Sequence, residues 1–323
     1  MLKDQPSLKP ALDRPYTKRI TEKRHWQVRA GSPGRLGWFL VTPALLVLLA
    51  MTVFPALYLL RSSFFSFTLL SGESHFVGLQ NYIYDLTNPD IRNSLLITLL
   101  FVVIAVGLEL VIGLALALAL ARQTLENNIA STLLLLPFAV TPVVSALLWR
   151  ELLNPNYGWV NYYLQQIGVM RAPVAWLSSP ITAWIALIGL DIWQWMPFVA
   201  LILMAGLQGV PPDLKEAATV DGAAGWQRFW HITLPLLRPF IAIAVLLRIV
   251  QSFKIFDTVQ VLTGGGPGTA TQVINLTIYR VALQDFSIGA ASALGIIFLV
   301  VVTIVVSQVL RVVAHNTDLV EER

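Results

Sequence analysis

The stretch Glu216–Pro235, EAATVDGAAGWQRFWHITLP, places charged side chains among alanines and glycines between two long apolar segments. Just before it, Pro212 suits the first turn of a helix, where a missing backbone N–H costs nothing. Glu216 then lies near the positive end of the helix dipole, which favours acidic side chains. Gly222 is suited to end the helix, because glycine readily adopts the left-handed conformation. We therefore predict a short helix over Pro212–Asp221.

This short helix is suited to docking against another protein. It is too short to cross a bilayer, and Ala217 and Ala218 leave one face low enough for close approach. A helix that rests among lipid headgroups usually has a cationic face and large apolar anchors, whereas this one has a single lysine, Lys215. We therefore favour a protein partner over a headgroup position.

The composition identifies a membrane protein. Of the 323 residues, 56% are hydrophobic and only 12% are charged, against about 25% charged in soluble domains. The absence of cysteine excludes disulfides and cysteine metal sites, and the four histidines are too scattered to predict a metal centre. The net charge of +4 is spread over loops beside apolar segments, which indicates membrane orientation and no nucleic-acid partner.

Six segments are apolar and long enough to cross a bilayer, so we predict an all-α membrane protein with six transmembrane helices. They are Leu36–Leu60, Ser94–Ala121, Ile129–Trp149, Ile181–Leu207, Leu236–Phe256 and Phe286–Leu310. The first segment competes with a signal peptide, because a basic tail precedes it. Its 25 charge-free residues exceed the usual apolar region of about 7 to 15 residues, and we therefore expect it to be retained.

Basic residues predict the orientation. With the first residue placed inside, fifteen lysines and arginines lie on the inner side and six on the outer side, so both termini and the Glu216 segment are expected to be cytoplasmic. The predicted organisation is a basic cytoplasmic tail over 1–35, a six-helix transmembrane domain over 36–312 with a cytoplasmic loop at 208–235, and a cytoplasmic tail over 313–323. The segments 63–91, 152–180 and 258–285 then face outward.

The Glu216 stretch resembles the EAA motif of inner-membrane permease subunits of binding-protein-dependent ABC importers. That motif reads E-A-A, three residues, G, nine residues and I-x-L-P, and the matching residues here are Glu216, Ala217, Ala218, Gly222, Ile232, Leu234 and Pro235. Two further stretches, PFVALILMAGLQGVPPDLKEAATVDGA and FDTVQVLTGGGPGTAT, resemble the carbohydrate-uptake, maltose-type branch. The resemblance covers about residues 36–312 and implies the ABC importer type I permease fold.

The resemblance also implies partners. The short helix, with Asp221 at its end, would fit a cleft in a separate ATPase subunit. A second and different permease, two ATPase copies, an external solute-binding protein and a sugar substrate would complete the importer. ATP and Mg²⁺ belong to the ATPase, because the glycine-rich stretch Gly264–Thr271 lacks the lysine of a phosphate-binding loop. We therefore expect a chain that is not an enzyme and holds no cofactor.

Polar and aromatic side chains inside the spans are candidates for the solute pathway. Asp191, Gln194, Trp195 and Phe198 share one face of the fourth span, and Gln251, Lys254, Ile255 and Thr258 share one face of the fifth, next to Ser252. Amides, hydroxyls and aromatic rings suit a sugar, and the resemblance places sugar contacts in the same two spans. The alternative is that these side chains only pack the helices together.

Glu109 and Arg248 lie midway along the second and fifth spans, so their depths match and we predict a buried ion pair. Alternatively, Arg248 and Lys254 receive an anionic solute. A rival function is a secondary transporter coupled to ions through Glu109 and Asp191, which predicts two related halves that the sequence does not display. An ion channel or a membrane-anchored scaffold would need a filter or a soluble domain, and neither is visible.

Overall fold

The computed structural model describes residues 33–68, 72–121 and 124–321. Most of the predicted N-terminal tail, 1–35, and the end of the predicted C-terminal tail therefore lie outside the described residues. The chain divides into two compact units, Met1–Pro55 and Ala56–Arg323. Helix α1, Pro33–Ser62, begins in the first unit, and every other element belongs to the second.

The described part of the chain is mainly helical. Its other long helices are α3 (Pro89–Leu120), α8 (Pro180–Gln208), α11 (Leu234–Ser252) and α14 (Ile288–Glu321). The shorter elements are β1 (Phe65–Phe67), β2 (Ser74–Phe76), α2 (Gln80–Thr87), α4 (Leu125–Leu134), α5 (Leu136–Ala139), α6 (Pro142–Leu152), α7 (Trp159–Gln166), α9 (Pro212–Val220), α10 (Gly225–Arg228), η1 (Phe229–Thr233), α12 (Asp257–Leu262) and α13 (Ile274–Leu283). Strands β1 and β2 pair antiparallel as a small hairpin.

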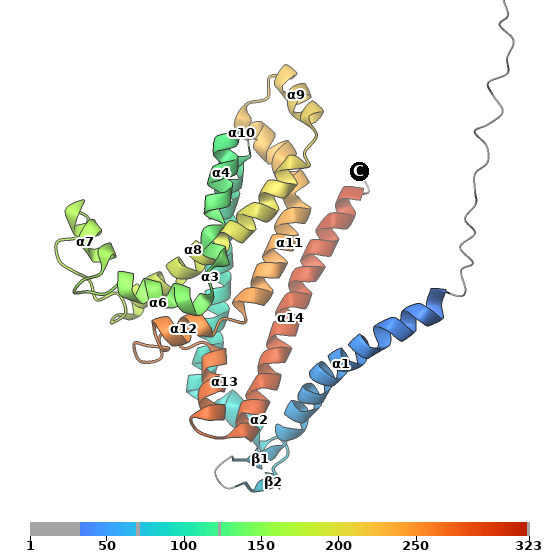
Figure 1. The fold of residues 1–323 in the computed structure, drawn as a ribbon, viewed down its shortest axis with the longest axis vertical. Helices are drawn as coiled ribbons and strands as arrows, with labels where there is room; N and C mark the ends of the chain where they lie inside the picture. Colours follow the sequence, from blue (N-terminus) through green and yellow to red (C-terminus); the bar gives the residue numbers. More distant parts are fainter. Residues whose placement is uncertain (1–32, 69–71, 122–123, 322–323) are drawn as a thin grey trace, which may run out of the picture. The chain divides into compact units, whose positions relative to one another are not determined.

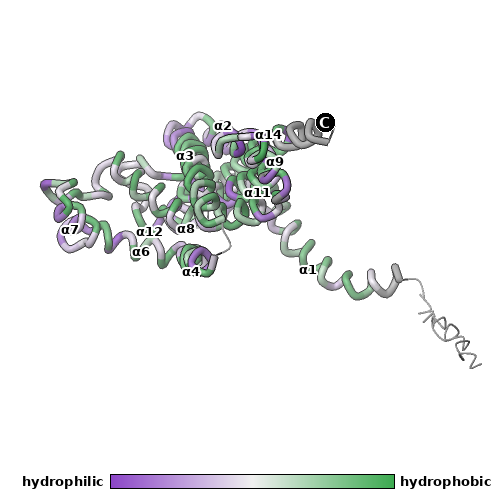
Figure 2. Tube along the Cα trace, turned by 90° about the horizontal axis from the view of Figure 1, so that it is seen from above, coloured by the Kyte–Doolittle hydropathy of each residue, from purple (hydrophilic) through white to green (hydrophobic). Residues whose placement is uncertain are grey.

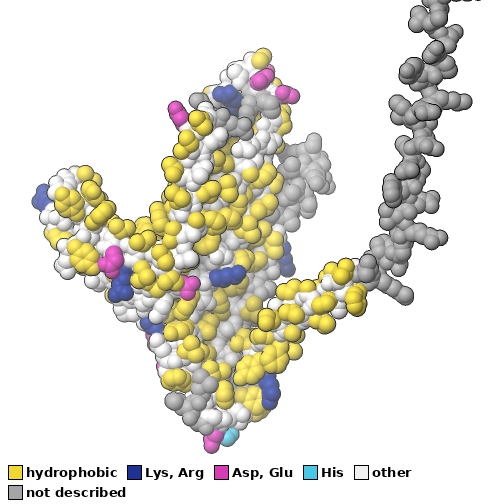
Figure 3. Space-filling view, in the orientation of Figure 1, with side chains coloured by type: hydrophobic (Ala, Val, Ile, Leu, Met, Phe, Trp, Pro, Cys, Tyr) yellow, Lys and Arg dark blue, Asp and Glu magenta, His cyan; other side chains and the backbone are white. Residues whose placement is uncertain are grey.

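Helices α3, α8 and α11 form the centre of the second unit (Figure 1). They approach closely at small residues: a Cβ added at Gly113 of α3 would lie 3.0 Å from the Val199 side chain, and one at Gly206 of α8 would lie 2.6 Å from the Phe240 ring. Such contacts are typical of helix packing in membranes. Hydrophobic side chains cover much of the visible surface of this unit (Figure 3), as expected of helices that face lipid.

Within the described residues, five helical stretches are long and apolar enough to cross a membrane, and a sixth arises if one bent pair counts as a single span. Four predicted spans correspond directly to α1, α3, α8 and α14. The stretch Gly225–Ser252 provides the fifth. The predicted membrane fold with six spans therefore agrees with the structure when the bent pair is counted.

The predicted third span, Ile129–Trp149, is broken in the structure. The chain runs through α4 and α5 and then turns by 96° into α6. Pro142 begins α6, and a proline disfavours the helical conformation of the residue before it; Thr141 is accordingly extended, with ψ 145°. The proline therefore divides the apolar segment into a broken span.

The fifth span ends earlier than the predicted boundary of Phe256. Helix α11 stops at Ser252, and the amide of Asn275 donates to the carbonyls of Phe253, at 2.7 Å, and Ile255, at 3.1 Å. The bond to Phe253 satisfies a carbonyl group at the helix end, and the bond to Ile255 satisfies one in the segment that follows. The chain then forms α12 and α13, two short helices that the sequence did not predict.

The glycine-rich stretch after α12 forms a tight turn. Gly264, Gly265 and Gly268 have positive φ angles, which side chains with a Cβ rarely adopt. The Arg280 guanidinium donates to the Gly264 carbonyl at 2.6 Å and thereby attaches the turn to α13.

Asp85 is a buried carboxylate on α2, beside α3 and α14. It is 1% exposed, and neither of its oxygens has a hydrogen-bond partner among the described residues. Burial raises the pKa of Asp85 from 3.8 to about 7, because a carboxylate away from water is disfavoured in its charged form. Between these two values the folded chain binds more protons at this group than the unfolded chain does.

The stability of the fold is therefore expected to fall as the pH rises from about 4 to about 7, on the order of 2–4 kcal/mol in the free energy of unfolding. Asp85→Asn, which stays neutral, should remove this fall and be more stable than the wild type above about pH 7. Thermal unfolding of the purified protein at several pH values measures the effect. Asp90→Asn, an exposed control on α3, should keep the wild-type dependence. If Asp85→Asn showed the same pH dependence of stability as the wild type, the effect could not be assigned to Asp85.

A π-helical turn lies between α9 and α11. Helix α10 leads into η1, and α11 follows without a break. π-Helical turns are rare, and they occur mostly as single turns inside α-helices at functional sites. Here the turn includes Ile232, and α11 begins with Leu234 and Pro235. The second half of the EAA motif is therefore the start of a membrane helix.

Candidate functional site

Helix α9 is the short helix predicted from the Glu216 stretch. It covers Pro212–Val220, with Asp221 as its C-cap. Gly222 follows with φ +75°, and the N–H of Ala223 donates to the Ala218 carbonyl at 2.9 Å. This left-handed glycine and backward hydrogen bond form a Schellman-type helix end. The prediction is confirmed, with the helix one residue shorter than expected.

The surface of α9 is open. The helix stands at one end of the second unit, and the β1–β2 hairpin stands at the other (Figure 1). Leu214 is 45% exposed and Val220 is 88% exposed, and Ala217 is exposed as well, whereas Ala218 is buried. Apolar side chains uncovered on a short terminal helix are typical of a protein interaction site.

An aromatic cluster that the sequence did not predict follows α9. The rings of Trp226, Phe229 and Trp230 lie 5.5 to 5.8 Å apart, and Trp226 is 71% exposed. The spacing of these residues at i, i+3 and i+4 indicates a shared helical face. The Arg228 guanidinium, on the same segment, donates to the Thr219 hydroxyl at 2.8 Å and attaches this segment to α9.

A charged cluster lies at the centre of the helix bundle. The Arg248 guanidinium on α11 donates to both carboxylate oxygens of Glu109 on α3, with one distance of 2.7 Å, and to the Asp191 carboxylate on α8 at 2.8 Å. Arg248 is 1% exposed, Glu109 0% and Asp191 4%. The predicted ion pair of Glu109 and Arg248 is therefore present, and Asp191 joins it.

This charged cluster links the three central helices of the bundle. Burying separated charges is costly in a membrane. The bidentate contact between the Arg248 guanidinium and the Glu109 carboxylate gives this ion pair favourable geometry. Asp191, predicted as a solute contact, pairs with Arg248 in the structure, and its contact with a solute stays a prediction. Two carboxylates engage the Arg248 guanidinium, but one of its nitrogens has no hydrogen-bond partner among the described residues, so the alternative in which Arg248 receives an anionic solute stays a prediction.

A row of aromatic side chains in contact with one another extends from the charged cluster. The Arg248 guanidinium lies 4.8 Å from the Trp195 ring centre, a distance at which a cation and an aromatic ring attract each other. Phe138 of α5 contacts Trp195 edge to face at 5.5 Å and stacks on Phe198 at 5.4 Å. The predicted residues Trp195 and Phe198 therefore share one side of α8, together with a ring from the broken span.

Gln194 has a structural contact of its own. Its Nε2 donates at 2.8 Å to the carbonyl of Val140, at the break between α5 and α6. Irregular backbone at membrane depth needs such partners, since lipid supplies none. Among the buried polar atoms described, Gln194 Oε1, one Arg248 nitrogen and Ser252 Oγ have no hydrogen-bond partner within the chain. Such atoms are free to bind a solute or water.

The face predicted for the fifth span is wrong, because α11 ends at Ser252. Lys254 is exposed beyond the helix end, Ile255 packs into a hydrophobic cluster, and Thr258 belongs to α12. Gln251 and Ser252 remain on α11. The substrate role of Gln251, Ser252, Lys254 and Ile255 stays a prediction.

Comparisons with known proteins agree with this arrangement. Residues 109–317 match the family described as the binding-protein-dependent transport system inner membrane component. The chain is 38% identical over 279 residues to the trehalose/maltose transport system permease protein of Thermococcus litoralis, covering 86% of this chain and 94% of the relative. It is 35% identical to the sulfoquinovosyl glycerol transport system permease protein of Agrobacterium fabrum, covering 86% and 90%.

A solved structure shares the fold. It is a chain of a bacterial alginate ABC transporter in complex with an alginate pentasaccharide-bound periplasmic protein, with a TM-score of 0.74 and 25% identity over 85% of this chain and 92% of that chain. The resemblance to ABC importer permeases, suggested by the EAA spacing, and to their carbohydrate-uptake branch, suggested by the two further stretches, is thereby confirmed, and the comparisons give no support to an ion-coupled secondary transporter. The chain belongs to the family of binding-protein-dependent transport system inner membrane components, and it is a multi-pass membrane permease.

Proposed function

We propose that this chain is one of two permease subunits of an ATP-driven importer, which takes up a neutral sugar delivered by an external binding protein. A separate ATPase dimer drives the cycle through α9, and both termini lie in the cytoplasm. The observation that carries the proposal is the EAA spacing on a short helix whose apolar residues, Leu214, Ala217 and Val220, are uncovered.

The external binding protein and the sugar are supported by the relatives. The family description names binding-protein-dependent transport. The structural neighbour was solved with a sugar-loaded periplasmic protein, and the Thermococcus relative is named for trehalose and maltose. A second permease is expected because six spans form half of a pathway in the importers that this chain resembles.

The charge of the central cluster favours a neutral sugar over an acidic one. One guanidinium faces two carboxylates, so with all three groups ionised the cluster carries a formal charge of −1. Arg248, behind Trp195, is therefore already compensated by carboxylates, and the cluster offers an anionic solute no net positive charge. The uncharged groups near it, Gln194 Oε1 and Ser252 Oγ, are suited to sugar hydroxyls.

Uptake by the complete importer in liposomes tests this function. Neutral disaccharides such as trehalose and maltose, and acidic oligosaccharides as a contrast, are offered with the binding protein and with ATP on the cytoplasmic side. We expect uptake of a neutral sugar that stops without ATP and without the binding protein. Uptake that persists without ATP would contradict the coupling, and a preference for acidic sugars would contradict the proposed solute.

Ala217→Glu tests whether the ATPase docks on α9. A charged side chain on the uncovered face should block docking of the ATPase, whereas Asp213→Asn, exposed on the same helix, should leave it nearly unchanged. Co-purification of the ATPase with each variant measures docking directly. Full co-purification with Ala217→Glu would exclude this face of α9 as the docking site.

A further inference from the structure

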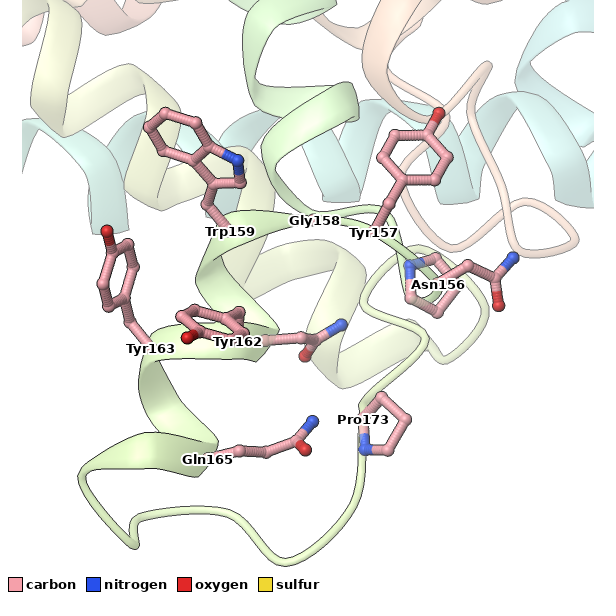
Figure 4. Close-up of a pocket in the computed structure, with 10 residues that line it drawn as sticks. Asn156, Tyr157, Gly158, Trp159, Tyr162, Tyr163, Gln165 and Pro173 are labelled. Carbon is pink, nitrogen blue, oxygen red and sulfur yellow. The ribbon is translucent and has the colours of Figure 1, made fainter.

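An uncharged cavity of about 500 Å³ lies beside α7, in the segment between α6 and α8. Figure 4 shows Trp159, Tyr162 and Tyr163 projecting from α7, and Asn156 and Tyr157 from the turn before it. Gln165, also on α7, adds another amide to the lining. The volume lies within the range of about 300–1,000 Å³ that is typical of sites for small ligands.

The cavity stands apart from the central charged cluster. In both Figure 1 and Figure 2, α7 lies away from α11 and α14 within the second unit. Its segment leads into Pro180, the first residue of α8, and the other end of α8 leads to α9. The 29 residues of α8 extend over about 43 Å. The cavity and α9 are therefore on opposite sides of the membrane, so a cytoplasmic α9 places the cavity outside.

Hydrogen bonds hold the α7 segment in shape. Asn161 is 3% exposed; its amide donates to the Val174 carbonyl at 3.0 Å, and its oxygen accepts from the Trp176 indole at 3.0 Å. Gly158 is needed where α7 begins, because a Cβ there would lie 2.4 Å from the carbonyls of Leu152 and Asn154. The aromatic rings are therefore attached to a fixed platform, which lowers the entropy cost of binding.

The aromatic side chains of this cavity are unusually open. Trp159 is 68% exposed, Tyr157 64%, Tyr162 60% and Tyr163 59%. A cluster of large exposed rings is unfavourable in water unless another surface covers it. The rings belong to seven consecutive positions, so a single ligand can contact several of them at once.

The chemistry of the lining matches a sugar. Aromatic rings offer flat apolar faces to the C–H groups of a pyranose, and the amides of Asn156 and Gln165 both donate and accept hydrogen bonds to hydroxyls. None of the residues that line the cavity is charged. A phosphate or carboxylate ligand would lack the basic partner that such groups usually have, and a metal ion would lack carboxylate or imidazole ligands.

We propose that α7 and the turn before it form an outer saccharide-binding site, separate from the pathway along α8 and α11, which takes a neutral pyranose unit. The inference rests on the proposed function. The site would hold a sugar weakly at the outer surface, close to where the binding protein releases it. A lipid headgroup layer is the competing occupant, since tryptophan and tyrosine also gather at membrane interfaces. The two amides and the cavity favour the sugar.

Binding to the whole importer in nanodiscs, without the binding protein, tests the site. Saturation-transfer NMR with maltose and maltotriose should give saturable binding with a Kd on the order of 1 mM, and Trp159→Ala and Tyr162→Ala should each weaken it about tenfold. Tyr84→Ala, a control at a ring that is 60% exposed on α2, should bind as the wild type does. Equal binding by Trp159→Ala and the wild type would overturn the proposal.

A second measurement separates sugar from lipid. The fluorescence of Trp159, taken as the difference between the wild type and Trp159→Phe, should respond to maltotriose and resist quenching by brominated lipids. Strong quenching by the lipids and no response to the sugar would instead place α7 in the headgroup layer. Transport by the wild type tells the two proposals apart: if it imports sugar normally while this site binds none, only the outer site is wrong.

Discussion

Replacing Arg248 with alanine is expected to destabilise the permease by about 3–5 kcal/mol, because it leaves two buried carboxylates without a partner. Glu109 and Asp191 would then face each other as like charges at membrane depth. In thermal unfolding of the purified complex, this corresponds to a decrease in Tm of roughly 10 °C. Transport should fall at least in proportion to the loss of assembled importer.

Three further variants serve as controls for the stability of Arg248→Ala. Arg248→Lys keeps the charge but cannot form the bidentate contact with Glu109, so its stability should lie between those of the wild type and Arg248→Ala. Arg238→Ala removes an exposed arginine from the same helix and should change Tm little. Combining Arg248→Ala with Glu109→Gln and Asp191→Asn should recover part of the loss. A Tm for Arg248→Ala equal to that of Arg238→Ala would refute the structural role of the cluster.

Gly222→Val is expected to reduce ATP-driven uptake about tenfold while the complex still assembles. Gly222 has φ +75°, and a Cβ there meets no atom within 4 Å, so the cost comes from the backbone alone. A β-branched residue in this conformation is strained by about 1–2 kcal/mol, which corresponds to about tenfold in an equilibrium. The turn after α9 should therefore shift, and with it the position of the EAA segment against α11.

The measurements for Gly222 are sugar uptake and ATP hydrolysis by the same liposomes. Hydrolysis without matching uptake is the expected signature of uncoupling. Gly222→Asn is the matched control, since asparagine tolerates the left-handed conformation, and it should retain most of the uptake. If Gly222→Val and Gly222→Asn transport equally well, the conformation of this turn has no part in coupling.

The features predictable from the sequence are those that depend on local order or on depth. Helix α9 follows from Pro212 and Gly222, because both act on the backbone of their own turn. The pairing of Glu109 with Arg248 follows from matching depth in two spans, since an unpaired charge in lipid is costly. Neither argument requires knowing how the helices are rotated against each other.

The features that were missed depend on tertiary contacts. Asp191 joins Arg248 only because α8 presents that face to α11, and periodicity alone does not tell which side of a helix meets which neighbour. The broken third span is stabilised by Gln194 of another helix, which bonds the Val140 carbonyl. The early end of α11 likewise depends on Asn275, more than twenty residues later in the chain. The apolar composition of these segments does not distinguish any of the three observed arrangements from the ones that were predicted.

The five residues Phe229–Thr233 wind less tightly than the helix around them. If this turn tightened to α-helical winding, one residue would be released, and the segment before it would rotate by about 100° and advance by about 1.5 Å relative to α11. This change of winding exchanges one set of backbone hydrogen bonds for another, so the helix stays folded throughout. In the proposed coupling, a push on α9 would reach the membrane helix through this π-helical turn, whose winding can change while the helix stays formed.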